Sequence, residues 1–151
     1  MSKHQKYKDD FVLLLEAGFI AAGQTDEDAA LKLFKASQLL EPKNGLPKVG
    51  FGYIHLLKLE LKQACKTFEE VLAAEPDNEM ARALLGLSTA LTVKEVGKGE
   101  QLLEEALKKA KDPSVKGMAQ TGLEFVNKFI KKQPTPVQAP MKKSAPKKKA
   151  S

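Results

Sequence analysis

Two consecutive stretches of the chain, residues 11–42 and 45–76, read FVLLLEAGFIAAGQTDEDAALKLFKASQLLEP and GLPKVGFGYIHLLKLELKQACKTFEEVLAAEP. They share a glycine, an alanine, a phenylalanine and a proline at equivalent positions. The matching pairs, whose residue numbers all differ by 34, are Gly18 and Gly52, Ala30 and Ala64, Phe34 and Phe68, and Pro42 and Pro76. Gly86 continues the glycine series by one more interval. Four residue types with one common period indicate a supersecondary unit copied head to tail.

Apolar residues recur at helical spacing from residue 11 to about residue 132, and no stretch alternates for long enough to indicate a strand. The pattern predicts seven helices, over residues 8–23, 26–40, 45–58, 61–74, 79–93, 97–110 and 114–131. The short connections predict antiparallel neighbours. We therefore expect an all-α fold of three helix hairpins, stacked as a short solenoid and closed by a capping helix.

Polar residues and prolines at the expected boundaries agree with these helices. Asp26 is placed to cap the second helix and Asp77 the fifth. Asp112 precedes Pro113, which combines a capping carboxylate with proline at a first helical position. The last predicted helix presents apolar residues for closing the stack: Met118, Leu123, Val126, Phe129 and Ile130.

The chain divides by composition into a leader, a solenoid and a tail. Residues 1–10 lead into the first helix, residues 11–132 form the solenoid, and residues 133–151 are rich in proline and lysine. Five lysines and no acidic residue lie in the tail, which we predict to be disordered. The remaining 132 residues carry about +1 of the net charge of +6. The solenoid therefore gives no reason to expect a specific nucleic-acid surface.

Cysteine content, apolar run length and the first residues favour a cytoplasmic protein. The one cysteine, Cys65, excludes an intramolecular disulfide and is consistent with a reducing compartment. The longest apolar runs, such as residues 11–15, are too short to span a membrane. The N-terminal residues lack the pattern of a secretory signal.

No catalytic or metal-binding constellation stands out in the sequence. His4 and His55 have no histidine or cysteine at metal-ligand spacing. Residues 97–99, Gly-Lys-Gly, are too few for a phosphate-binding loop. We expect a protein that is not an enzyme and that has no metal and no cofactor.

A 34-residue helix-turn-helix with glycine, alanine, phenylalanine and proline at positions 8, 20, 24 and 32 resembles the tetratricopeptide repeat. The three repeats begin at Phe11, Gly45 and Glu79, and the third has one residue inserted near residues 94–98. Positions four and eleven depart from the family pattern, with Lys48, Arg82, Ala21, His55 and Thr89. The resemblance covers most of the chain and specifies the fold more than the function.

The resemblance implies that the first helix of each repeat lines a concave surface, with positions 2, 5, 9 and 12 facing it. Those positions hold Val12, Leu15, Phe19, Ala22, Leu46, Val49, Tyr53, Leu56, Met80, Ala83, Leu87 and Ala90. None of the twelve is charged, whereas repeats that hold a terminal carboxylate carry lysine, asparagine or arginine at positions 5 and 9. An apolar groove of this kind favours the apolar face of an amphipathic helix. The alternative is that a shifted register places some of these residues in the core.

In its size, its three repeats and its apolar groove, the chain resembles the cytoplasmic chaperones of bacterial type III secretion. The resemblance implies that a needle subunit inserts its amphipathic helix into the groove, with a small co-chaperone alongside. Sequestration would then prevent assembly before export. Three alternatives stay open: a chaperone of the translocator class, a scaffold subunit whose basic tail contacts a polyanion, and a homodimer formed through the empty groove.

Overall fold

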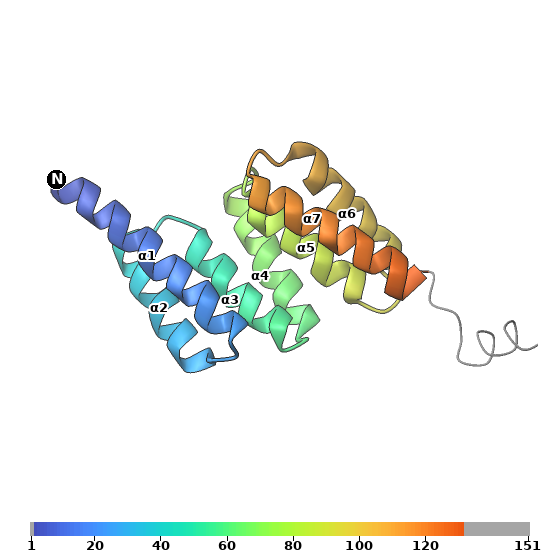
Figure 1. Cartoon of the computed structure of the whole chain (residues 1–151), viewed down its shortest axis with the longest axis horizontal. Coiled ribbons are helices and arrows are strands. Elements are labelled where there is room, and N and C mark those ends of the chain that lie inside the picture. Colours follow the sequence, from blue (N-terminus) through green and yellow to red (C-terminus); the bar gives the residue numbers. More distant parts are fainter. Residues whose placement is uncertain (1, 132–151) are drawn as a thin grey trace, which may run out of the picture.

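The computed structural model describes residues 2–131, which form seven α-helices and a terminal π-helix (Figure 1). The elements are α1 (Lys3–Gly23), α2 (Glu27–Leu40), α3 (Leu46–Leu57), α4 (Leu61–Ala74), α5 (Glu79–Leu91), α6 (Val96–Lys109), α7 (Pro113–Phe125) and η1 (Val126–Lys131). The predicted all-α class is confirmed. The predicted disordered tail, residues 133–151, lies outside the described residues.

The helices form a short row of hairpins. Each of α1, α3 and α5 packs against the helix that follows it, and α7 packs on α6. The odd-numbered helices also contact one another in order, α1 with α3, α3 with α5, and α5 with α7. Figure 1 shows α1 and α7 on opposite sides of a bend in this row, with α3 and α5 between them. The odd-numbered helices therefore share one face of the molecule.

Helix boundaries follow local capping, with two corrections to the sequence prediction. Helix α1 begins at Lys3, because the Ser2 hydroxyl accepts the Gln5 amide at 3.1 Å, so most of the predicted leader is helical. Helix α5 is capped by Asn78, whose Oδ1 accepts the Ala81 amide at 3.0 Å, and not by Asp77. The predicted caps of α2 and α7 are confirmed.

The turn inside each hairpin contains one residue with left-handed backbone geometry. These residues are Thr25, Leu59 and Lys94, with φ of 63°, 58° and 70°. Thr25 and Leu59 are separated by the repeat period, whereas Lys94 falls one position late, because the turn Thr92–Glu95 is one position longer than the equivalent turns. The expected one-residue insertion is therefore confirmed, and it lies between α5 and α6.

The repeated phenylalanine explains the repeated glycine. A Cβ atom built on Gly18 would lie 2.5 Å from Cε1 of Phe34, and one built on Gly50 would also lie 2.5 Å from it. The ring of Phe34 thus touches the backbones of α1 and α3 together. Phe68 makes the same contact with Gly52. Both phenylalanines are fully buried, so any added side chain at these glycines must displace a core ring.

Two carboxylates fix the connections between hairpins. Glu75 accepts the amide of Gly45 at 2.8 Å, just before α3. Glu79 accepts the amides of Lys111 and Asp112 at 2.8 and 3.1 Å, just before α7. These bonds supply acceptors for turn amides that no helix satisfies. The hydrogen bond from Lys111, followed by the one from Asp112, lowers the pKa of the Glu79 carboxyl.

The close approach of α5 and α6 at Gly99 gives a stability prediction. A Cβ atom at Gly99 would overlap the backbone of Ala90, which cannot move aside as a flexible side chain could. We expect Gly99→Ala to lower the free energy of unfolding by about 1–3 kcal/mol or more. Gly97→Ala is the matched control in the same helix, because nothing lies within 4 Å of its added Cβ. That variant should gain roughly 0.5–1 kcal/mol. Urea unfolding of both variants measures the difference, and equal effects would contradict the packing described.

The depressed pKa of Glu79 predicts a pH-dependent contribution to stability. Because the pKa is lower in the folded state, the ionised carboxylate stabilises the fold above the ordinary glutamate pKa. That contribution is lost as the pH falls through the folded pKa. Glu79→Gln should therefore lower the thermal midpoint above about pH 5, and its difference from the wild type should shrink as the pH falls below the ordinary glutamate pKa. A difference that stays constant over the whole acid range in which the protein is folded would show that the carboxylate charge is not responsible.

Candidate partner-binding groove

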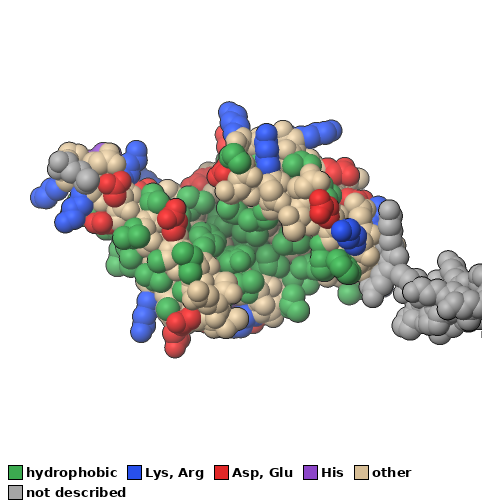
Figure 2. Space-filling view, in the orientation of Figure 1, with side chains coloured by type: hydrophobic (Ala, Val, Ile, Leu, Met, Phe, Trp, Pro, Cys, Tyr) green, Lys and Arg blue, Asp and Glu red, His purple; other side chains and the backbone are tan. Residues whose placement is uncertain are grey.

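Hydrophobic side chains gather in the bend of the helical row. Figure 2 shows them as one continuous surface in a hollow between α1 and α7. We call this hollow the groove, with α3 and α5 as its floor. Its half-buried or exposed apolar residues are Phe19 from α1, Leu46 and Tyr53 from α3, Met80, Leu87 and Leu91 from α5, and Met118 and Phe125 from α7. Leu57, at the end of α3, lines a separate small hollow with Ala22 and Ile54.

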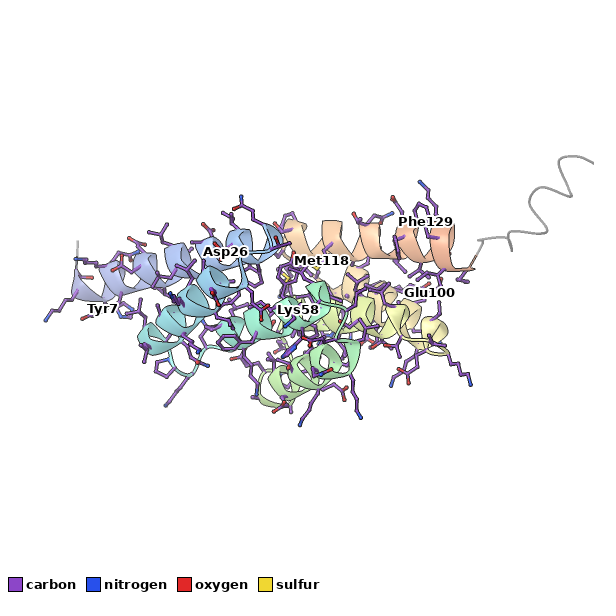
Figure 3. All side chains as sticks on the ribbon, turned by 90° about the horizontal axis from the view of Figure 1, so that it is seen from below. Tyr7, Asp26, Lys58, Glu100, Met118 and Phe129 are labelled. Carbon is purple, nitrogen blue, oxygen red and sulfur yellow. The ribbon has the colours of Figure 1, made fainter. Side chains whose placement is uncertain are left out.

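One central group of side chains holds the middle of the groove together. Phe19, Tyr53, Leu87 and Met118 come from four different helices, and all pack against the cluster that contains Phe68. The rings of Phe19 and Tyr53 are 5.5 Å apart between centroids. Figure 3 shows Met118 near the middle of the molecule, with Tyr7 toward one end and Phe129 toward the other. Elements far apart in sequence thus contribute to one surface.

The structure leaves some of the predicted groove positions accessible and buries others. Phe19, Leu46, Tyr53, Met80 and Leu87, at positions 2 and 9 of the repeats, are half-buried at the groove, and Val12 is 47% exposed on α1. The residues at positions 5 and 12 are buried instead. They are Leu15, Ala22, Val49, Leu56, Ala83 and Ala90, at 8% exposure or less.

Packing between hairpins explains this correction. Val49 and Leu56 join Ala81 and Leu84 of α5 in one core cluster. Ala83 packs with α6 residues and with Val115 of α7. Val49, Leu56 and Ala83 are therefore covered by other helices and offer a partner almost no surface. The prediction that positions 5 and 12 are open in the groove is wrong, except that Leu15, at 8% exposure, still lines a hollow at one end of it.

The sequence prediction lacks three residues of the groove. Leu91 occupies position 13 of its repeat, as the exposed Leu57 does in the repeat before, so leucine recurs there with the repeat period. This recurrence is the signal that could have found Leu91. Met118 is predicted only to cap the stack, and Phe125 is absent from the prediction. Phe125 is 40% exposed and its ring centroid lies 5.3 Å from that of Phe129.

The groove has two chemically different ends. The end near the C-termini of α5 and α7 is a hollow of about 480 Å³, lined by Leu87, Leu91, Gly117, Met118, Thr121, Gly122 and Phe125. We call it the apolar end, because none of these side chains is charged. The two glycines leave room that side chains would otherwise fill.

The end near the N-termini of α3, α5 and α7 is a hollow of about 510 Å³. Its apolar lining consists of Leu15, Phe19, Leu46, Met80 and Val115, and its neutral polar lining of Asn44, Asn78 and Ser114. Four carboxylates complete it: Glu16, Glu75, Glu79 and Asp112. We call this part of the groove the acidic end.

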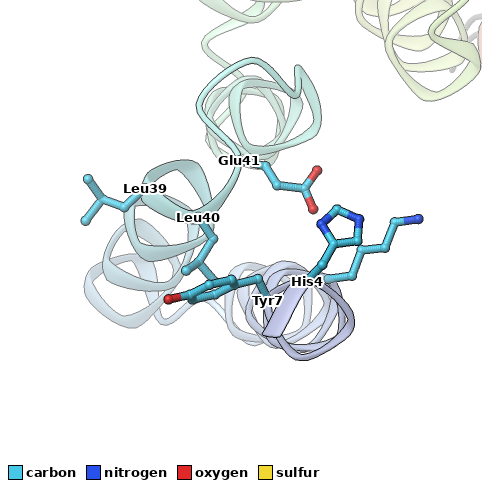
Figure 4. Close-up of a pocket in the computed structure, with 6 residues that line it drawn as sticks. His4, Tyr7, Leu39, Leu40 and Glu41 are labelled. Carbon is cyan, nitrogen blue, oxygen red and sulfur yellow. The ribbon is translucent and has the colours of Figure 1, made fainter. Parts of the chain in front are cut away.

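A separate hollow of about 570 Å³ lies at the outer end of the first hairpin (Figure 4). The first turns of α1 contribute His4, Tyr7 and Lys8, and the end of α2 contributes Leu39 and Leu40, with Glu41 beyond it. Its lining is mixed in polarity, and it shares no lining residue with the groove. The groove, and not this hollow, is therefore the apolar candidate site.

Comparison with known proteins does not assign a family. No protein-family model matches the chain, and no curated protein gives a significant match. Across residues 2–131, no helix combines the length and apolar character needed to cross a membrane. Function is therefore inferred from the fold and from the groove.

The position of Tyr53 gives a prediction that separates surface from core. Tyr53 packs against two core clusters, so Tyr53→Ala should lower the free energy of unfolding by about 1–3 kcal/mol. Leu57 is 46% exposed in the same helix, and Leu57→Ala should cost less than about 1 kcal/mol. Urea unfolding compares the two variants. A larger loss of unfolding free energy for Leu57→Ala than for Tyr53→Ala would contradict the burial described for these two side chains.

Proposed function

We propose that this protein binds the amphipathic helix of a partner protein in the groove and so keeps that helix from other contacts. The observation that carries the proposal is the continuous apolar surface contributed by α1, α3, α5 and α7 (Figure 2). Large exposed apolar patches on monomers usually mark binding sites, because leaving them in water is unfavourable. A helical partner supplies anchors at intervals of three and four residues, which suits a surface made of adjacent helical ridges.

The accessible apolar side chains are of the kinds that are common in protein–protein interfaces. Leu91, Met118 and Phe125 are large and apolar, and methionine and aromatic side chains are enriched in protein interfaces. The apolar end has no charged lining residue that would need to be desolvated on binding. Association there would remove apolar surface from water with little opposing electrostatic cost.

Within this class, we propose a cytoplasmic chaperone of type III secretion whose client is a needle subunit. The support is a resemblance of size, repeat number and groove chemistry, which is an argument by analogy. A subunit that polymerises through a helix must have that helix covered before export, and an apolar groove would provide the cover. The alternatives differ from this proposal in the partner: a scaffold subunit would bind a permanent component of an assembly, and a translocator chaperone would bind a translocator protein.

The test is recovery of partners from the native host with matched variants of the full chain. Leu91→Glu and Phe125→Glu place a charge on the floor and on the α7 wall of the apolar end, where burial by a partner would be costly. Leu39→Glu is the control, because Leu39 is 82% exposed and lies outside the groove. We expect a small helical protein to co-purify with the wild type and with Leu39→Glu. Its recovery should fall at least about tenfold with either groove variant.

Circular dichroism and thermal midpoints establish that the three variants remain folded. Identification of the partner by mass spectrometry then separates the candidates. A secreted subunit that is released during export agrees with the chaperone proposal, whereas a partner held permanently in an assembly favours the scaffold. Recovery of ribosomal or nucleic-acid-linked proteins alone, with equal yield from all variants, would refute helix binding in the groove.

A further inference from the structure

We propose that the partner helix carries a lysine or arginine at one end of its apolar face, and that this end lies over the acidic end of the groove. The inference rests on the proposed function and specifies the chemistry of the partner. It also gives the bound helix a fixed direction, because the two ends of the groove differ in charge. The apolar end would take the remainder of the apolar face.

No carboxylate of the acidic end forms an ion pair with a basic side chain of residues 2–131, although the charge of Lys111 acts on Glu79 from nearby. Its lining holds Glu16, Glu75, Glu79 and Asp112 and no lysine, arginine or histidine. None of the ion pairs in the described part of the chain uses any of these four carboxylates. The carboxylates that are paired with a basic side chain are Glu27, Glu60, Glu70, Glu100 and Glu105. Four carboxylates without a basic partner among the described residues therefore share one hollow of the groove.

The hydrogen bonds made by these carboxylates leave their charge in place. Glu75, Glu79 and Asp112 accept neutral amide donors, which orient the carboxylates without cancelling the negative charge. An ionised carboxylate has about four acceptor sites, so further donors can be accommodated. The helix N-termini beside Glu79 and Asp112 offset part of their charge. Glu16 lies within α1, far from its N-terminus, and has no such compensation.

The apolar lining of the acidic end matches the shape of a long basic side chain. Leu15, Phe19, Leu46, Met80 and Val115 line the same hollow as the four carboxylates. Lysine and arginine bury an aliphatic stem against apolar surface and keep the charged group in contact with polar groups or water. A short acidic side chain would meet only repulsion there. The lining therefore favours a basic residue next to the apolar face of the helix.

The experiment is a selection from displayed helical peptides of about five turns, with fixed leucines on one face and randomised residues elsewhere. The target is the full-length chain at low ionic strength, where electrostatic selection is strongest. We expect lysine and arginine to be enriched about threefold or more at one end of the peptides, with aspartate and glutamate depleted there. Glu16→Gln should reduce this enrichment. Glu104→Gln is the matched control, because Glu104 is exposed on α6 and outside the groove lining.

A selected peptide then gives the quantitative test by fluorescence anisotropy. Its Kd should rise about two- to fivefold with Glu16→Gln, as expected for an exposed charge pair, and stay unchanged with Glu104→Gln. The effect of Glu16→Gln should disappear in about 0.5 M salt. For a peptide whose basic residue is lysine, carbodiimide coupling should form an amide between its ε-amine and Glu16 in preference to Glu104.

The outcomes distinguish this inference from the proposed function. In the first outcome, the selected peptides show no preference for basic residues, but their binding is still lost with Phe125→Glu. That result would overturn the charge recognition and leave helix binding in the groove intact. Failure to enrich any peptide over the Phe125→Glu background would overturn both. In a third outcome, the selection shows no basic preference, and carbodiimide couples the chain's own lysine-rich tail to Glu16 when no peptide is present. That result would assign the acidic end to the tail and overturn the inference.

Discussion

The ring of Phe34 lies against the backbones of α1 and α3 at the same time, at Gly18 and Gly50. This contact sets how closely the first two hairpins approach, because an aromatic ring fills the space that two side chains would otherwise occupy. Within the second and third hairpins, Phe68 lies against Gly52 and Leu103 against Gly86 in the same way as Phe34 lies against Gly18. Phe34 thus fixes α3 beside α1, and the cluster that joins Val49 and Leu56 to Leu84 fixes α5 beside α3. The groove follows from this side-by-side position.

The bend of the helical row decides which side chains are available for binding. Residues that point along the row, such as Val49 and Ala83, are covered by the next hairpin. Residues that face the bend, such as Leu87 and Leu91, stay partly exposed and line the apolar end of the groove. The last helix, α7, supplies the opposite wall and also closes the core through Val115 and Ala119. One helix therefore serves both stability and the candidate site.

The carboxylates at the acidic end combine a structural role with an available charge. Glu75 and Glu79 hold the connections before α3 and α7, so each is needed for the fold whether or not a partner binds. Their position at the groove follows from the same geometry, since the N-termini of the odd-numbered helices α3, α5 and α7 meet there. Glu16 has no comparable structural bond within the described residues. A substitution at Glu16 should therefore change partner recognition with the least effect on folding.

The all-α class, the repeat period, the boundaries set by Asp26 and Asp112, and the insertion in the third hairpin can all be predicted from the amino-acid sequence. Each depends on local chemistry: helical periodicity, side-chain capping or turn length. Which apolar positions stay open is a property of the packed structure. Leu56 and Leu57 are adjacent leucines, yet one is 6% exposed and the other 46%. The two side chains point to different sides of α3, and Leu56 joins Leu84 of α5 in one core cluster. Which side of the helix is covered is decided by contacts between residues distant in the chain.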